Sequence, residues 1–181
     1  MAAIYNTTID QGAHWFITFI YKQPATITNI TGNGTTVTFT ASNGFTAGQI
    51  IDVDGVLPGV YNLQSVAVNT ASTSQFTVLN AATGIYISGG LATGAVNITG
   101  YTAALQIRSL PQDATAVLSL TSASGITITG ATGTIAVTAT AAQTGDIDEG
   151  PYYYDLEITS PTGVVTRVAQ GQVVVSAQVT R

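Results

Sequence analysis

The chain has 181 residues and a formal net charge of −5, and only 7% of its residues are charged, against about 25% in ordinary globular domains. Its few basic residues are scattered, which excludes the clustered Lys and Arg needed to bind a phosphate backbone; they are Lys22, Arg108, Arg167 and Arg181. The lack of cysteine excludes disulfides and thiol-based metal or redox sites.

Apolar residues make up 45% of the chain, and Thr, Ser, Gly, Asn and Gln replace the missing charge. Thr and Val favour strands, whereas Gly, Asn and Ser favour turns, so the composition indicates β-structure. A weakly charged surface repels its neighbours little, which suits a chain packed in an assembly. The N-terminus shows no basic stretch followed by an apolar core, and no apolar run approaches the roughly 20 residues that span a bilayer. We expect synthesis in the cytoplasm and no membrane partner.

Two strands are predicted near the N-terminus, at Ile4–Ile9 and His14–Tyr21, with a turn around Gln11 and Gly12 between them. Both alternating faces of the second strand are largely apolar, which predicts burial on both sides. Pro24 then predicts a break, because proline cannot donate to a central ladder.

The segment 25–94 has a rhythm of its own, with about six short strands. The predicted strands are Ala25–Ile30, Thr35–Thr40, Gln49–Val53, Leu63–Val68, Gln75–Leu79 and Ile85–Ser88. A Gly/Asn turn typical of hairpins, Thr31–Gly34, separates the first two. The pattern predicts a small antiparallel barrel or sandwich, inserted between the two parts of a discontinuous domain, 1–24 and 95–181.

Alternating residues predict further strands from residue 96 onward. These are Tyr101–Ser109, Val117–Leu120, Ile126–Thr129, Thr134–Thr140, Tyr152–Ser160, Val164–Val168 and Gly171–Val179. Ala139–Gln143 is the one place where a helical turn is expected, and Ser160–Gly163 is typical of a type I hairpin turn. No segment of ten or more residues shows helical periodicity, so the predicted fold class is all-β.

The single histidine, His14, offers little chemistry. It cannot form a two-histidine metal site, and no Gly-x-Ser-x-Gly elbow accompanies it. Its place in a predicted strand beside Trp15 favours structural packing. The glycine pairs lie between strands and not before a helix, so no phosphate-binding loop is predicted. We expect neither a cofactor nor an enzymatic activity.

Acidic residues gather in one loop, at Asp146, Asp148 and Glu149. Oxygen-rich loops can hold Ca²⁺, but this spacing does not match an EF-hand. Solvated turn acids are the favoured interpretation, with a weak Ca²⁺ site as the alternative. Asp52 and Asp54 alternate on a predicted strand and are a second acidic pair.

Aromatic residues cluster in the second strand, from Trp15 onward, and in a later strand at Tyr152, Tyr153 and Tyr154. Alternation turns the middle tyrosine away from its two neighbours, which favours a core with a polar rim. A protein interface at the three tyrosines is the second interpretation. A sugar-stacking platform of the tyrosines with Trp15 is the third.

Four segments together resemble a β-sandwich module that many tailed bacteriophages encode. They are Ala3–Gly12 (AIYNTTIDQG), Ile98–Arg108 (ITGYTAALQIR), Tyr154–Arg167 (YDLEITSPTGVVTR) and Gly171–Arg181 (GQVVVSAQVTR). In that module a short link follows the aromatic strand, whereas here residues 25–94 replace it. The insert resembles a small β-module of phage structural proteins, most typically at Gly44–Val56.

The resemblance implies an antiparallel, Ig-like β-sandwich interrupted by a small β-domain, with no catalytic residues. It implies a structural protein of the virion, assembled in the host cytoplasm, that acts as an adaptor in the tail, baseplate or fibre. The implied partners are other virion proteins and further copies of the chain, with neither nucleic acid nor membrane. A capsid decoration protein and a carbohydrate-binding module for host attachment are the alternatives.

Overall fold

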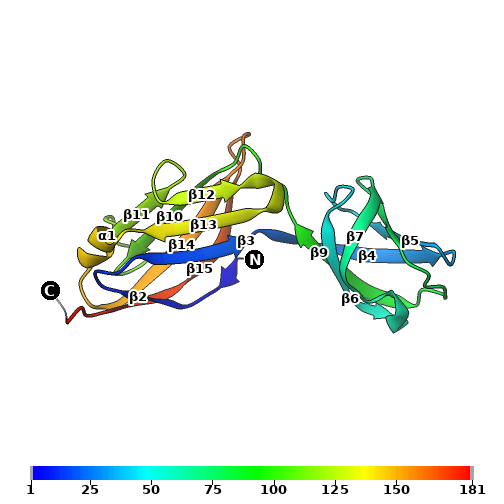
Figure 1. Cartoon of the computed structure of the whole chain (residues 1–181), viewed down its shortest axis with the longest axis horizontal. Coiled ribbons are helices and arrows are strands. Elements are labelled where there is room, and N and C mark those ends of the chain that lie inside the picture. The colour runs from blue at the N-terminus through cyan, green and yellow to red at the C-terminus, as the bar shows by residue number, and fades with distance from the viewer. Residues whose placement is uncertain (1, 180–181) are drawn as a thin grey trace. The chain divides into compact units, whose positions relative to one another are not determined.

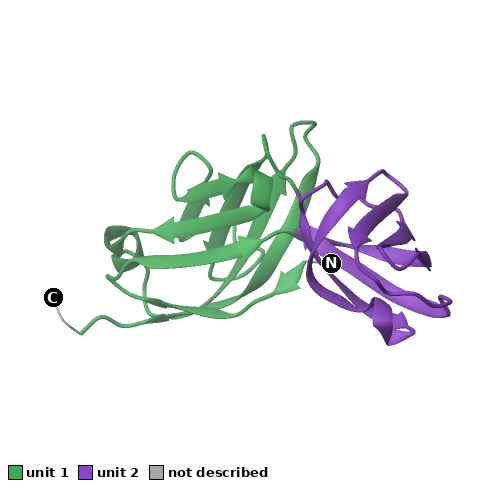
Figure 2. Cartoon of the chain, turned by 45° about the vertical axis from the view of Figure 1, so that its right-hand side comes forward, with its two compact units in different colours: residues 1–21, 97–181 green, residues 22–96 purple. Residues whose placement is uncertain are grey.

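The computed structural model describes residues 2–179, and it is an all-β structure, as predicted. It divides into unit 1, made of residues 1–21 and 97–181, and unit 2, made of residues 22–96 (Figure 2). Each unit contains complete strand ladders of its own. Thr180 and Arg181, the end of the segment Gly171–Arg181, lie outside the described residues.

Unit 1 consists of two sheets that face each other (Figure 1). The larger has the order β1 (Ala3–Ile4), β15 (Val165–Ser176), β14 (Gly150–Thr159), β10 (Thr102–Arg108) and β11 (Leu118–Thr121), and β2 (Thr7–Asp10) also pairs with β15. The smaller has the order β12 (Ile126–Thr129), β13 (Thr134–Ala139) and β3 (Trp15–Ile20). β1 and β2 run parallel to β15, and the other ladders are antiparallel.

Both sheets send every second side chain into the space between them, which is the core of unit 1. The buried residues of β10, β13 and β14 are Ala103, Leu105, Ile107, Ile135, Val137, Ala139, Tyr152, Tyr154, Leu156 and Ile158. A five-residue helix, α1 (Ala141–Gly145), follows β13. It begins two residues later than predicted, because Thr140 and Gln143 form a capping box in which each side chain bonds the other's backbone.

The N-terminal strands differ from the prediction. The first is interrupted and forms β1 and β2, with Tyr5 and Asn6 between them. The prediction that β3 is buried on both sides was wrong: Phe16 is 79% exposed and Ile20 54% exposed. β3 belongs to a sheet with only one covered face, so its outward side chains meet solvent. The packing role expected of His14 was also wrong, because this residue is exposed and precedes β3.

Unit 2 is a closed antiparallel barrel. Around it the strands follow the order β4 (Lys22–Gly32), β5 (Thr36–Ala41), β8 (Gln75–Leu79), β7 (Leu63–Ala71), β6 (Ile50–Leu57) and β9 (Ser88–Ala95). A short 3₁₀ turn, η1 (Gly59–Tyr61), follows β6. Closure gives every strand two neighbours, which removes the exposed edges of an open sheet.

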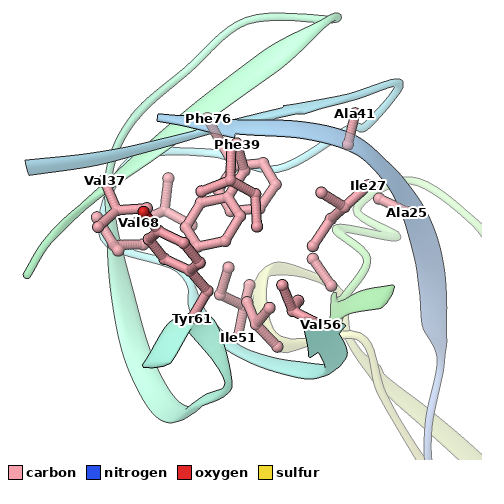
Figure 3. Close-up of a cluster of buried hydrophobic side chains, with 14 residues drawn as sticks. Ala25, Ile27, Val37, Phe39, Ala41, Ile51, Val56, Tyr61, Val68 and Phe76 are labelled. Carbon is pink, nitrogen blue, oxygen red and sulfur yellow. The ribbon is translucent and has the colours of Figure 1, made fainter. Parts of the chain in front are cut away.

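Aromatic rings fill the centre of the barrel (Figure 3). Phe39 and Phe76 stack with ring centroids 4.9 Å apart, and Phe45 meets Phe76 edge-on at 5.2 Å. The Tyr61 ring is fully buried, and its hydroxyl donates a 2.8 Å hydrogen bond to the carbonyl of Gly84. Unit 2 therefore has a core of its own.

Two local predictions in unit 2 were wrong. Pro24 does not break the chain but lies in β4, opposite Thr93 of β9. This part of β4 pairs only with β9, since its pairing with β5 begins at Ile27, so a residue without an amide proton is tolerated there. The predicted strand Ile85–Ser88 is misplaced as well, because β9 begins only at Ser88 and runs through Gly89 and Gly90 to Ala95. A Cβ on Gly90 would lie 2.6 Å from a methyl group of the β6 strand, so glycine permits the close approach.

Candidate binding surface

The outward face of the larger sheet in unit 1 carries a hollow of about 690 Å³. Polar side chains of β10, β14 and β15 line most of it, and we call this set the polar face. It comprises Gln106, Arg108, Tyr153, Asp155, Glu157, Arg167, Gln170 and Gln172. In a chain with so little charge, this concentration of charged side chains makes the hollow the candidate binding surface.

Strand register brings the polar face together. Tyr153 lies between Arg108 of β10 and Gln172 of β15. In the next row, Asp155 lies between Gln106 and Gln170. Residues directly opposite in antiparallel strands share one side of the sheet, so positions far apart in the sequence form adjacent rows.

Arg167 joins the two acids of the face. Its Nε lies 3.2 Å from a carboxylate oxygen of Asp155 and 3.5 Å from one of Glu157, and its Nη1 donates to Oε1 of Gln170 at 3.2 Å. All three charged side chains are more than a third exposed, so solvent screening leaves the pairs little weight in stability. Their effect is to fix the positions of the two carboxylates.

Arg108 is held differently. Its Nη2 donates to Oε1 of Gln106 at 2.7 Å, and its Nη1 donates to the backbone carbonyl of Asp113. Both acceptors are uncharged, and no ion pair to Arg108 occurs within residues 2–179. Because no described carboxylate compensates this guanidinium, it can pair with a carboxylate of a partner.

The N-terminal segment is fixed at the margin of the hollow. The hydroxyl of Tyr154 donates to the carbonyl of Tyr5 at 2.7 Å, and the amide of Gln172 donates to Oδ1 of Asn6 at 2.9 Å. Gly171 lies directly against the backbone of Tyr5, since a Cβ added at Gly171 would be 2.0 Å from the Tyr5 carbonyl oxygen. Tyr5, Asn6, Tyr154 and Gly171 therefore have a structural role at this margin.

The flanking tyrosines of the 152–154 run are core residues. Burial, and then the neighbouring Tyr5, raises the pKa of Tyr154 to about 12. Burial, and then Asp148, raises the pKa of Tyr152, whose hydroxyl donates to the Asp148 carbonyl at 2.9 Å. Both hydroxyls therefore stay protonated and act as hydrogen-bond donors at neutral pH.

The raised pKa of Tyr154 predicts that unit 1 loses stability in alkali. Well below pH 10 the hydroxyl is protonated in both states, so this group does not make the free energy of unfolding depend on pH. Between pH 10 and 12 the unfolded chain loses this proton while the folded chain retains it, so the free energy of unfolding falls as pH rises, by up to about 1.4 kcal/mol per pH unit. Denaturant titrations followed by the fluorescence of Trp15, the single tryptophan, measure unit 1 directly.

Tyr154→Phe should flatten this dependence above pH 10, whereas Thr162→Ala, which removes no titratable group from an exposed turn of the same unit, should leave it unchanged. Equal slopes in the wild-type chain and in Tyr154→Phe would contradict the assignment.

The aromatic residues singled out in the sequence do not come together on the surface. Tyr152, Tyr154 and Trp15 are buried, with 8%, 5% and 7% exposure, and only Tyr153, at 37%, reaches the polar face. A four-ring stacking platform is therefore not formed. The alternation along the strand predicted that Tyr153 turns away from Tyr152 and Tyr154, and the exposed fractions of the three side chains confirm this.

The acidic residues do not form a metal cluster. Asp146, Asp148 and Glu149 are exposed around the buried Ile147, and no group of three or more His, Cys, Asp or Glu side chains suited to a metal ion occurs in residues 2–179.

The second acidic pair, Asp52 and Asp54, makes contacts within the barrel. Asp52 accepts a 2.9 Å hydrogen bond from the amide of Ser65 and lies 3.8 Å from Nζ of Lys22, and Asp54 accepts one from Gln64 at 2.7 Å.

Unit 2 exposes a second, apolar surface beside η1. Leu57 and Val60 are 57% and 54% exposed, and Ile85 and Ile87 are 86% and 71% exposed. The two segments are adjacent, because the amide of Ile87 donates to the Leu57 carbonyl at 2.9 Å. We call these four residues the apolar rim. The sequence analysis predicted neither the apolar rim nor the polar face.

No protein-family model matches the chain, and no curated protein matches it. Among the described residues, no helix has the length and apolarity that crossing a membrane requires.

Proposed function

We propose that this chain is a structural protein of a bacteriophage virion, acting as an adaptor in the tail, baseplate or fibre through protein–protein contacts. The supporting observation is that two units with separate cores present surfaces of different character. Unit 1 presents the polar face, and unit 2 presents the apolar rim. An adaptor needs two such surfaces, because it holds two different neighbours.

The phage-like segments support a docking role for the polar face. Gln106 and Arg108 come from one segment, and Asp155, Glu157 and Arg167 come from another. Their outward side chains meet on one side of the sheet, although residues 109–153 separate the two segments. The shared pattern thus includes surface residues as well as core residues, which favours a common mode of docking.

Strand order supports an Ig-like sandwich for unit 1. In the Ig fold, strands B, E and D form one sheet and C, F and G the other. Here β3, β13 and β12 occupy the first set of places and β10, β14 and β15 the second. The bond from Tyr152, near the start of β14, to the Asp148 carbonyl matches the tyrosine corner of that fold. Unit 2 then occupies the connection between strands B and C.

Quantitative mass spectrometry of purified particles of the encoding phage tests the proposal. We expect the chain in the particles at a few to a few dozen copies each. Hundreds of copies would replace the tail assignment by capsid decoration, and absence from the particles would contradict a virion role. Glycan-array binding that is lost in Tyr153→Ala would instead favour host attachment.

The polar face is tested by complementation. Arg108→Glu reverses the charge that has only uncharged partners, so we expect incorporation into particles to fall at least tenfold. Thr162→Glu places the same glutamate side chain in an exposed turn of the same unit and is expected to leave incorporation unchanged. Equal incorporation of both variants would contradict a docking role for the polar face.

A further inference from the structure

One edge of the smaller sheet in unit 1 is open. β3 pairs with β13 on one side, and in residues 2–179 no strand pairs with its other side. The amide of Tyr21 donates to the Gly133 carbonyl at 2.8 Å, and bonded residues alternate along an antiparallel ladder. The N–H and C=O groups of Phe16, Thr18 and Ile20 therefore point away from β13, toward the open edge.

The sandwich is not sealed at this edge. Ile17 and Phe19 face the core from β3, yet both are only half-buried. Their partners one strand further in, Val137 and Ile135, are fully buried. The Tyr5 ring meets Phe19 edge-on, with ring centroids 6.0 Å apart, and covers part of it. The inward side chains of β3 thus remain partly accessible, and on the outer face Phe16 and Ile20 are exposed.

β3 also lacks the features by which natural proteins block edge strands. These are charged side chains, prolines and bulges. Its sequence, WFITFI, contains neither charge nor proline, and its pairing with β13 has no bulge. A six-residue strand with exposed apolar side chains and free backbone groups can take up another strand.

We propose that a second copy of this chain occupies the edge, with the two β3 strands antiparallel about Thr18. The strand is nearly palindromic in that register. Thr18 opposes its own counterpart, Phe16 opposes Ile20 of the second copy, and Ile17 opposes Phe19. The outer pair covers both exposed side chains, and the inner pair seals both half-buried positions.

The same register satisfies the backbone. Phe16, Thr18 and Ile20, whose groups point toward the edge, become the hydrogen-bonded residues of the new ladder. The two smaller sheets join into one continuous sheet with a twofold axis at Thr18, an isologous interface. Because a single strand pair buries little area, we expect weak association, with a dissociation constant of roughly 10–500 µM.

Cross-linking tests the register, because the chain has no cysteine. Thr18→Cys places two thiols across the axis with Cα atoms about 5.5 Å apart, within the range of roughly 4.4–6.8 Å that a disulfide requires. We expect this variant to form a covalent dimer on oxidation at high protein concentration. Thr138→Cys, exposed on the neighbouring β13, should remain at least tenfold less cross-linked.

Sedimentation equilibrium tests the interface itself. Thr18→Lys sets two ammonium groups opposite each other, so we expect the dissociation constant to rise at least tenfold. Thr127→Lys, an exposed position on the opposite edge strand β12, is the matched control and should associate like the wild-type chain. Thermal unfolding of both variants checks that the monomers remain folded.

A wild-type chain that stays monomeric up to about 1 mM, well above the expected dissociation constant, would overturn the proposal. A dimer that persists in Thr18→Lys, or equal cross-linking of the two cysteine variants, would also overturn it. These outcomes do not depend on a virion role, since an edge of this kind would pair in any assembly that contains two copies.

Discussion

A variant in which a short Gly/Ser linker replaces residues 22–96 is expected to fold into a stable unit 1. All ladders of its two sheets, and its core, use residues outside the deleted segment. The deletion also leaves ends that are easy to join. Lys22 pairs with Ala95, and paired residues in an antiparallel ladder lie about 4.5–5.5 Å apart. The chain therefore enters and leaves unit 2 at adjacent points, where insertions are tolerated.

Residues 22–96 alone are likewise expected to fold, because the closed barrel has its own core and no open edge. Amide proton dispersion in nuclear magnetic resonance spectra and cooperative thermal unfolding measure both fragments. An unfolded fragment of either kind would show that the division into units is wrong.

Gly171→Ala is expected to destabilise unit 1 severely. The added Cβ would lie 2.0 Å from the carbonyl oxygen of Tyr5 and 2.8 Å from its carbonyl carbon. These are backbone atoms, so the N-terminal segment has to move, and it loses the hydrogen bonds from Tyr154 and from Gln172 to Asn6. Overpacking of this kind typically costs 1–3 kcal/mol, and each lost bond adds about 1 kcal/mol.

Denaturant unfolding followed by Trp15 fluorescence measures this loss. Gly44→Ala is the control, because no atom lies within 4 Å of its added Cβ, and a surface change of this kind stays within about 0.5 kcal/mol. Unchanged stability in Gly171→Ala would contradict the close approach of the Tyr5 backbone to Gly171.

The sequence determined the fold class and the positions of most strands. Alternation located β8 (Gln75–Leu79) and β12 (Ile126–Thr129) to the residue, because their inward and outward positions differ sharply in polarity. It also indicated that Tyr153 turns away from its neighbours. The domain boundaries expected near residues 24 and 95 fall at 21/22 and 96/97 in the structure, since β4 and β9 pair as far as Lys22 and Ala95.

Only the tertiary structure decided which faces and edges are covered. The apolar faces of β3 look equally suited to burial in the sequence, yet one is covered and the other exposes Phe16 and Ile20. The polar face likewise depends on register, which aligns Gln106 with Asp155. Alternation is a local property of one strand, whereas burial, register and an open edge depend on which strands lie beside it. For β3, no described strand lies beside its second edge, and no residue pattern within the strand indicates this open edge.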